Sequence, residues 1–182
     1  HGYFKDQIVP VTISNAKKGT SVTVDTDEVF RRDCTMETLA KLKPAFKPDG
    51  VATAGNSSPN SDGASAVILM EAEKAKSLGC EILGYINGFT SAGVDPTIMG
   101  IGPVAATRKL LSKTGLTMDD IDVIEMNEAF APQSLSCIKE LGMDLNKLNP
   151  NGGAIALGHP VGATGSRLIT TALHELERSD QT

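Results

Sequence analysis

The sequence predicts an α/β fold with a mostly parallel sheet, on three observations. From residue 64 onward, short apolar segments alternate with segments of helical character, an order typical of strands joined by helices. Residues 64–70 form a continuous apolar run, as in a strand buried on both faces of a sheet. Glycines stand directly after several helical segments, where left-handed backbone commonly ends a helix.

The chain before residue 60 has a different character. Residues 8–13 and 20–24 are rich in β-branched side chains, and the polar residues 15–19 between them predict a hairpin. Residues 25–62 are rich in Asp, Pro, Gly, Ser and Asn, and within them only residues 36–42 suit a short helix. An irregular segment of this length is usually functional.

Local signals predict the later elements. The helix over 103–114 has Pro103 in its first turn and Gly115 just beyond its end, and the helix over 128–141 stops at Gly142. The expected elements, in chain order, are strand 64–70, helix 71–78, strand 82–89, helix 103–114, a helix start at 117–120, strand 122–126, helix 128–141, a strand start at 148–149 and helix 166–178.

Composition excludes several classes of function. The 182 residues are 40% hydrophobic and 21% charged, as in soluble globular proteins, and the net charge of −5 argues against nucleic-acid binding. No apolar run approaches the roughly 20 residues that span a bilayer, so we expect no membrane span. The three cysteines are widely spaced, which argues against a disulfide framework or a metal site and fits a reducing compartment.

His159 is the first candidate for chemistry. It lies in a stretch, residues 151–165, that contains five glycines. Glycines let the backbone approach other groups closely, and Pro160 restricts the conformation of the histidine before it. Histidine titrates near neutrality and transfers protons. His159 is therefore either a structural histidine or a proton-transferring group on a rigid mount.

Asn127 is the second candidate, because it follows the strand expected over 122–126 and precedes a helix. It is either the N-cap of that helix or an amide that fixes a water or a substrate oxygen. Hydrogen-bond donors aimed at developing negative charge are often a large catalytic contribution.

A locally basic segment is the third feature. It is either a solvated face or a site for a phosphorylated ligand. Residues 53–58, which follow it closely, are small or carry hydroxyls and suit the lining of a narrow channel. No Walker A sequence is present, which disfavours nucleotide hydrolysis. The basic residues are Arg31, Arg32, Lys41, Lys43 and Lys47.

Three segments together resemble the thiolase family. Residues 53–63 read TAGNSSPNSDG, residues 127–130 read NEAF and residues 152–165 read GGAIALGHPVGATG. Residues 93–103 also fit, so the resemblance covers nearly the whole chain.

The resemblance implies a layered α-β-α-β-α fold. By similarity, residues 1–60 are part of a loop domain on the CoA-binding side. Residues 61–82 return to the N-terminal half. Residues 83–182 are most of the C-terminal half, incomplete at its end.

The resemblance also implies an acyltransferase. Thiolases condense an acyl-CoA with acetyl-CoA in a reversible Claisen reaction, or cleave a 3-ketoacyl-CoA with CoA. CoA and acyl-CoA are substrates, and no cofactor is bound permanently. His159 matches the histidine that activates a nucleophilic cysteine and helps to hold the thioester oxygen. Asn127 matches the asparagine that holds a water in the same oxyanion hole.

Other matches are implied ligand contacts. Ser58 matches a residue that contacts pantetheine, and Arg31 matches one near the adenine end of CoA. Phe46, Met99 and Phe130 match residues that line the pantetheine and acyl pocket. A homodimer or homotetramer is implied, soluble in the cytoplasm or, in a eukaryote, in the mitochondrial or peroxisomal matrix.

The cysteines depart from the family pattern. Cys34, Cys80 and Cys137 match neither catalytic cysteine, and Cys137 lies within a helix, where we expect it to pack. We therefore expect the chain alone to be inactive, as a partial sequence or a natural remnant. The alternative is a non-catalytic thiolase-like protein that binds CoA or lipid, or an inert fragment. The related ketosynthases are disfavoured, because NEAF stands where they carry their first histidine.

Overall fold

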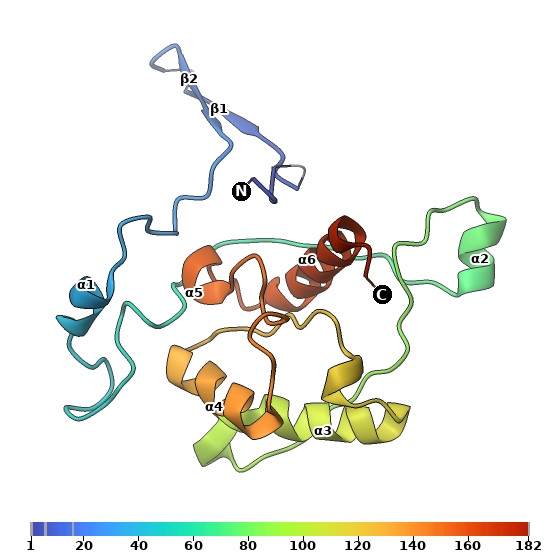
Figure 1. Ribbon diagram of the computed structural model, residues 1–182. Helices are drawn as coiled ribbons and strands as arrows, with labels where there is room; N and C mark the ends of the chain where they lie inside the picture. The colour runs from blue at the N-terminus through green and yellow to red at the C-terminus, as the bar shows by residue number, and fades with distance from the viewer. Residues whose placement is uncertain (1, 6, 16, 182) are drawn as a thin grey trace.

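The computed structural model describes residues 2–5, 7–15 and 17–181. In Figure 1, helices α3 to α6 gather into one body, whereas the β1–β2 hairpin, α1 and α2 project from it. The elements, with η for a 3-10 helix, are β1 (Val11–Asn15), β2 (Thr20–Val24), α1 (Met36–Ala40), α2 (Ala72–Ser77), η1 (Pro96–Ile101), α3 (Gly102–Thr114), η2 (Met118–Asp120), α4 (Ala131–Leu141), α5 (Ala154–Leu157) and α6 (Thr164–Ser179).

The predicted hairpin is confirmed, although its first strand begins at Val11 rather than at residue 8. Strands β1 and β2 pair antiparallel, with Val11 opposite Val24 and Asn15 opposite Thr20. Every residue of both strands is exposed. The turn predicted over 15–19 includes residue 16, which lies outside the described residues.

The hydrophobic core lies between α3, α4 and the segment that precedes α4. Its buried members are Val104 on α3, Cys137 on α4, Met126 and Met143. Cys137 is fully buried, so the prediction that it packs is confirmed. Both helices end on a glycine with left-handed backbone, as predicted, with φ of 76° at Gly115 and 63° at Gly142.

The strands predicted over 64–70 and 82–89 are wrong for the described chain. Both segments run as loops, because no described strand lies alongside to form their ladder of main-chain hydrogen bonds (Figure 1). Their apolar side chains are consequently open to solvent, with Ile68 86% and Phe89 78% exposed.

A trace of the predicted parallel sheet remains beside α4. Ile124, in the strand expected over 122–126, forms a parallel bridge with Leu148. The main-chain N–H of Ile124 donates to Lys147 O, and that of Asn149 donates to Ile124 O, both at 2.8 Å. This pairing fixes the segment that leads into the NEAF residues.

Among the described residues, no helix combines the length and the apolar character needed to cross a bilayer.

Candidate active site

The three sequence motifs, far apart along the chain, meet at one place. We name them the TAGN segment (residues 53–58), the NEAF segment (127–130) and the histidine loop (152–165). The TAGN and NEAF segments lie side by side: Ser57 forms an antiparallel bridge with Phe130. This bridge holds Phe130 in extended backbone, so α4 begins at Ala131 rather than at residue 128 as predicted.

The TAGN segment is shaped by its own asparagine. The Asn56 side chain accepts a hydrogen bond from Thr53 N at 2.7 Å and donates one to Val51 O at 3.0 Å. The turn therefore presents Ser58 to the NEAF segment, where its hydroxyl donates to Ala129 O at 3.1 Å. Asn56 was not singled out from the sequence, although turns built by asparagine side chains are common.

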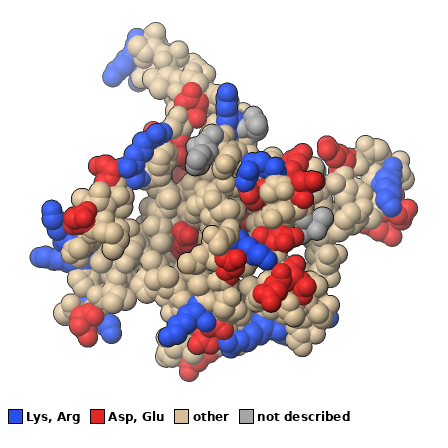
Figure 2. Space-filling view, viewed as in Figure 1, with Lys and Arg blue, Asp and Glu red and all other residues tan. Residues whose placement is uncertain are grey.

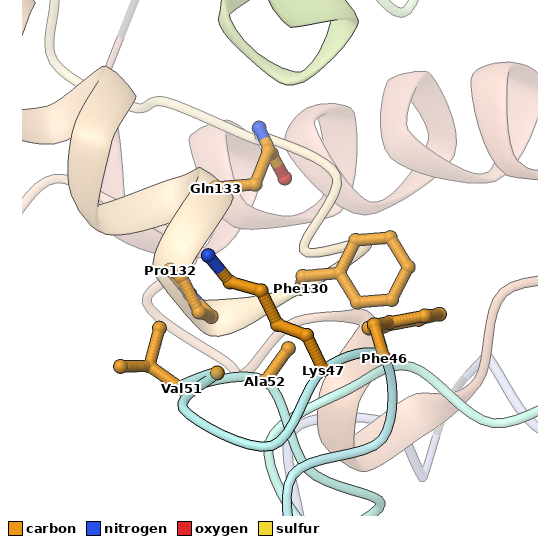
Figure 3. A pocket seen from close by; sticks show the side chains of 8 residues that line it. Phe46, Lys47, Val51, Ala52, Phe130, Pro132 and Gln133 are labelled. Carbon is orange, nitrogen blue, oxygen red and sulfur yellow. The ribbon is translucent and has the colours of Figure 1, made fainter. Parts of the chain in front are cut away.

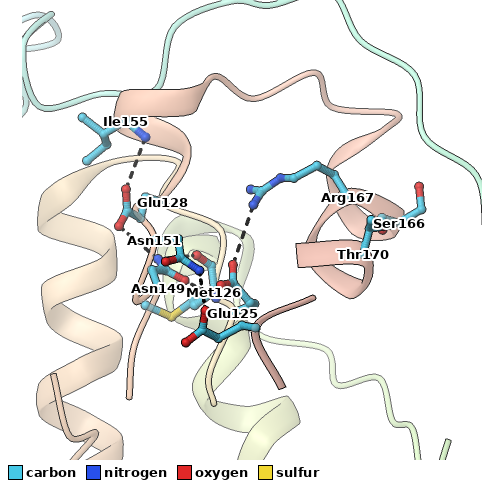
Figure 4. A network of polar contacts seen from close by, with 10 residues as sticks. Glu125, Met126, Glu128, Asn149, Asn151, Ile155, Ser166, Arg167 and Thr170 are labelled. Carbon is cyan, nitrogen blue, oxygen red and sulfur yellow. Dashed lines mark hydrogen bonds and ion pairs between the residues drawn. The ribbon is translucent and has the colours of Figure 1, made fainter. Parts of the chain in front are cut away.

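Glu128 joins the NEAF segment to the histidine loop. Its Oε2 accepts from the main-chain N–H of Ile155 at 3.2 Å, and its Oε1 accepts from Asn149 Nδ2 at 3.0 Å (Figure 4). A β-carbon at Gly153 would overlap the Glu128 carboxylate, so the loop comes this close only because that residue is glycine.

Asn149 supports the same junction, and sequence reasoning missed it. Its buried side chain accepts from Met126 N at 2.8 Å and donates to Met126 O at 2.9 Å, as a neighbouring strand would. It does so with left-handed backbone, φ 43°. Asparagine is among the residues that tolerate this conformation best.

Asn127 and His159, the two predicted catalytic residues, are brought together. Asn127 Nδ2 lies 3.3 Å from His159 Nε2, and both residues are partly buried. The Oδ1 of the same amide is buried, with no hydrogen-bond partner among the described residues. The N-cap reading of Asn127 is wrong, because the cap position of α4 belongs to Phe130.

The second ring nitrogen of His159, Nδ1, contacts the side chain of Thr164. Its Oγ1 lies 2.7 Å from His159 Nδ1. Before the histidine, Gly158 has a φ of 99° and lies so close to Ser61 that a β-carbon would clash with the serine hydroxyl. The left-handed backbone at Gly158 and the contact with the Thr164 hydroxyl therefore fix His159, consistent with the rigid mount predicted from composition.

An apolar hollow of about 330 Å³ lies beside the NEAF segment. Phe46 and Phe130 meet there edge to face, with ring centroids 5.6 Å apart (Figure 3). The volume falls within the roughly 300 to 1,000 Å³ of small-molecule sites. The lining residues are Phe46, Lys47, Gly50, Val51, Ala52, Phe130, Pro132 and Gln133.

The other residues predicted to contact the ligand are Ser58, Met99 and Arg31, and none of them lines this hollow. Ser58 stands on the adjoining TAGN segment and is partly buried. Met99 is 75% exposed and does not line the hollow. Its neighbour Gly100 packs against Gln133, which does line it. Arg31 is exposed on the chain between β2 and α1.

The basic residues of the predicted phosphate site are all exposed. The guanidinium carbon of Arg32 lies over the Phe30 ring, 5.0 Å from the ring centroid. On the face seen in Figure 2, acidic and basic side chains are interspersed, without a continuous basic area. The assignment of this segment to a phosphorylated ligand stays a prediction.

A buried ion pair lies behind the site, on the segment that leads to Asn127. Glu125, with its side chain 4% exposed, faces Arg167 of α6 with an O–N distance of 3.7 Å (Figure 4). Neither carboxylate oxygen has a hydrogen-bond partner among the described residues. Burial raises the pKa of the Glu125 carboxyl to about 7, opposed by the charge of Arg167 and reinforced by Glu175 and Glu128.

In the part of the chain that the structure describes, no group of three or more His, Cys, Asp or Glu side chains is placed to hold a metal ion. The two polar partners of the His159 ring, Asn127 and Thr164, include no thiol. Cys137 instead contacts Gly100 O and Gln133 within the core. The described site thus holds an imidazole and an amide without an adjoining thiolate.

Family models match both parts of the chain. The model described as thiolase, N-terminal domain, matches residues 1–73, and that described as thiolase, C-terminal domain, matches residues 80–182.

Curated relatives are similar over nearly the whole chain. An acetyl-CoA acetyltransferase of Pseudomonas aeruginosa is 55% identical over 179 residues, which are 98% of this chain and 45% of the relative. The peroxisomal 3-ketoacyl-CoA thiolase B of Rattus norvegicus is 53% identical over 97% of this chain and 42% of its own. The chain thus spans less than half the length of these relatives.

Solved structures agree. The Bacillus anthracis acetyl-CoA acetyltransferase superposes with a TM-score of 0.92 at 49% identity, covering 99% of this chain and 45% of that one. Human mitochondrial 3-ketoacyl-CoA thiolase in complex with CoA superposes with a TM-score of 0.91 at 46% identity, covering 99% and 44%. The predicted α/β fold class is confirmed by this likeness.

Proposed function

Because the chain belongs to the thiolase family, we propose that it supplies the histidine and the asparagine of a thiolase active site. The activity is transfer of an acyl group between CoA thioesters, either by condensing an acyl-CoA with acetyl-CoA or by cleaving a 3-ketoacyl-CoA with CoA. The observation that carries the proposal is the 3.3 Å approach of Asn127 Nδ2 to His159 Nε2.

The two groups suit the chemistry of a thioester. His159 Nε2 takes the proton of a thiol, which leaves the thiolate that attacks the acyl carbon of an acyl-CoA. The proton then on Nε2 and the Asn127 amide, directly or through a water, donate hydrogen bonds to the oxygen that gains negative charge. Donors of this kind lower the barrier because charge develops on that oxygen only in the transition state. The bond from the acyl carbon to the CoA sulfur then breaks, and the departing CoA thiolate takes the proton back from Nε2.

The thiol must come from outside the described site, since neither polar partner of His159 is a cysteine. We therefore propose that the 182-residue chain does not turn over acyl-CoA by itself. The active species would be a thiolase in which this chain is joined by the rest of the fold.

We propose that the pantetheine part of CoA binds in the apolar hollow. Phe46 and Phe130 offer aromatic surface to pantetheine, and Ser58 offers a polar contact beside them. Met99 is assigned to the acyl end, and Arg31 to the adenine end of CoA. The CoA complex of the human mitochondrial relative supports CoA as the ligand class.

The experiment is a chimera. The 45% of the Pseudomonas aeruginosa acetyl-CoA acetyltransferase that this chain matches is replaced by the chain, and thiolysis of acetoacetyl-CoA is followed. The chimera should be active, and His159→Ala should lower kcat by about 10²- to 10⁴-fold. His174→Ala, which changes a histidine within α6 rather than in the histidine loop, is the matched control. Near-normal turnover in the His159 variant would defeat the proposal.

A second candidate is a non-catalytic protein that binds CoA or a lipid, or an inert fragment. It is favoured by the absence of a thiol next to His159 in the described site. Calorimetric titration of the 182-residue chain with CoA separates the readings. Binding without turnover in the chimera supports the binding protein, and neither binding nor turnover supports the inert fragment.

We also propose the domain division at residues 1–60, 61–82 and 83–182. The N-terminal family model ends at residue 73 and the C-terminal one begins at residue 80, close to the proposed boundary between residues 82 and 83. Homodimeric or homotetrameric assembly, and a location in the cytoplasm or in an organelle matrix, are proposed on the family relation alone.

A further inference from the structure

Thr164 is buried at the start of α6, with 4% of its surface exposed. Its hydroxyl oxygen lies 2.7 Å from His159 Nδ1 and 3.0 Å from the carbonyl oxygen of Pro160. The threonine therefore contacts the imidazole on the opposite nitrogen from Asn127.

The hydroxyl has one proton to donate, and its two neighbours decide where that proton lies. The Pro160 carbonyl oxygen accepts the main-chain N–H groups of Ala163 at 2.8 Å and Thr164 at 2.9 Å, and it also accepts from the Thr164 hydroxyl at 3.0 Å. The lone pairs that remain on Thr164 Oγ1 then accept the N–H of His159 Nδ1. The proton of the neutral imidazole is thereby placed on Nδ1.

The Asn127 side of the ring leads to the same tautomer. A proton on Nε2 would point at Asn127 Nδ2, which is itself a donor, whereas a free lone pair on Nε2 accepts from that amide at 3.3 Å. Both contacts of the ring are thus satisfied when Nδ1 carries the proton and Nε2 does not.

We infer that Thr164 is a positioning residue, whose hydroxyl holds His159 in the Nδ1–H tautomer and so presents an unprotonated Nε2 beside Asn127. Its catalytic consequence rests on the proposed function, because only a proton-accepting His159 benefits from it. The tautomer itself is a property of the chain that requires no substrate.

The test is nuclear magnetic resonance on the 182-residue chain labelled with ¹⁵N-histidine, well above the ordinary histidine pKa of about 6.5. Ring nitrogen shifts distinguish protonated from unprotonated nitrogen. The signals of His159 are those lost in His159→Gln. We expect a protonated Nδ1 and an unprotonated Nε2, whereas histidines free in water favour the proton on Nε2.

Two variants link the tautomer to the hydroxyl. Thr164→Val keeps the shape without the hydroxyl, and the Nδ1–H form should fall from nearly all molecules to a minority. Thr164→Ser restores the hydroxyl and should restore the wild-type shifts. Far-UV circular dichroism checks that each variant folds.

A protonated Nε2 in the wild-type chain overturns the inference, even if the valine variant does not fold. An Nδ1–H form that persists in a folded Thr164→Val variant overturns it as well. Both outcomes are read without CoA or turnover, so failure here is distinguishable from failure of the thiolase chimera.

Discussion

Glu128 and Gly153 fit so closely that a β-carbon on the glycine would occupy the space of the glutamate carboxylate. This contact holds the NEAF segment against the histidine loop, and with it the pairing of Asn127 and His159. The glycine backbone at this position is extended, with φ −119° and ψ −169°, so the need for glycine is one of space alone.

Gly153→Ala should therefore destabilise the fold. The added methyl must displace a carboxylate that is hydrogen-bonded to Ile155 N and Asn149 Nδ2, at a cost of about 1 to 3 kcal/mol. For a chain of this size, that corresponds to a fall in Tm of roughly 2 to 4 °C per kcal/mol. Thermal unfolding followed by circular dichroism measures it.

Gly162→Ala is the matched control. It lies in the same loop, but a β-carbon there meets no atom within 4 Å and the backbone is not left-handed. Equal melting temperatures for the two variants would show that the Glu128 contact does not hold the loop.

Asn127→Ala should impair the thiolase chimera through kcat. Loss of one donor near the developing charge costs about 10²- to 10³-fold, while KM changes little because the ground state is less affected. Asn127→Asp should be at least as harmful, since it places a carboxylate where negative charge develops. Initial rates of acetoacetyl-CoA thiolysis at varied substrate concentration separate kcat from KM.

Asn15→Asp, on the β1–β2 hairpin, controls for the chemical change. Asn15 accepts a hydrogen bond from Lys18 N through Oδ1, which an aspartate retains. If Asn127→Asp behaves like this surface variant, the amide does not contribute to the oxyanion site.

The local elements could be predicted because their signals are local. Proline in the first turn and glycine at the end fixed the expected helix over 103–114, and α3 spans Gly102–Thr114. The expected strands over 64–70 and 82–89 did not form, because a strand needs a hydrogen-bonded neighbour and apolar composition does not supply one. The parallel bridge of Ile124 with Leu148 exists because both partners are present.

The catalytic candidates of the site could be predicted from the sequence, but the residues that hold them in place could not. Asn127 and His159 lie in sequence motifs that resemble those of a known family. Glu128, Asn149 and Thr164 act only through contacts between segments. The sequence placed Glu128 in the first turn of a helix, but the bridge between Ser57 and Phe130 keeps it in front of α4. From sequence alone, only the five glycines of residues 151–165 hinted at a close neighbour.

Phe46→Ala should weaken CoA binding by the chain about tenfold, which corresponds to about 1.4 kcal/mol. The ring forms one wall of the hollow and meets Phe130 edge to face at 5.6 Å. Apolar surface covered by a ligand is worth roughly 25 cal/mol per Å², so a ring of this size accounts for a loss of about this much. Isothermal titration calorimetry with CoA gives Kd. Phe89→Ala is the control, since that ring is 78% exposed and lies near Lys113 rather than in the hollow. Equal Kd values would remove Phe46 from the proposed site.

Glu125→Gln should change how stability depends on pH. Burial raises the pKa of Glu125 to about 7, from 4.5 in the unfolded chain. The folded state therefore binds the proton more tightly. The resulting stability is fully present below pH 4.5 and is lost as pH rises through 7. Glutamine stays neutral at all pH, so this loss should be missing from the variant.

The difference in unfolding free energy, wild type minus Glu125→Gln, should fall by up to about 3 kcal/mol between pH 4.5 and 8. Urea unfolding at a series of pH values measures it. Glu73→Gln, whose parent side chain is 76% exposed on α2, controls for loss of a carboxylate at the surface. A difference that stays level across this range would mean that Arg167, 3.7 Å away, keeps Glu125 ionised throughout, so that the pair behind Asn127 carries a fixed charge.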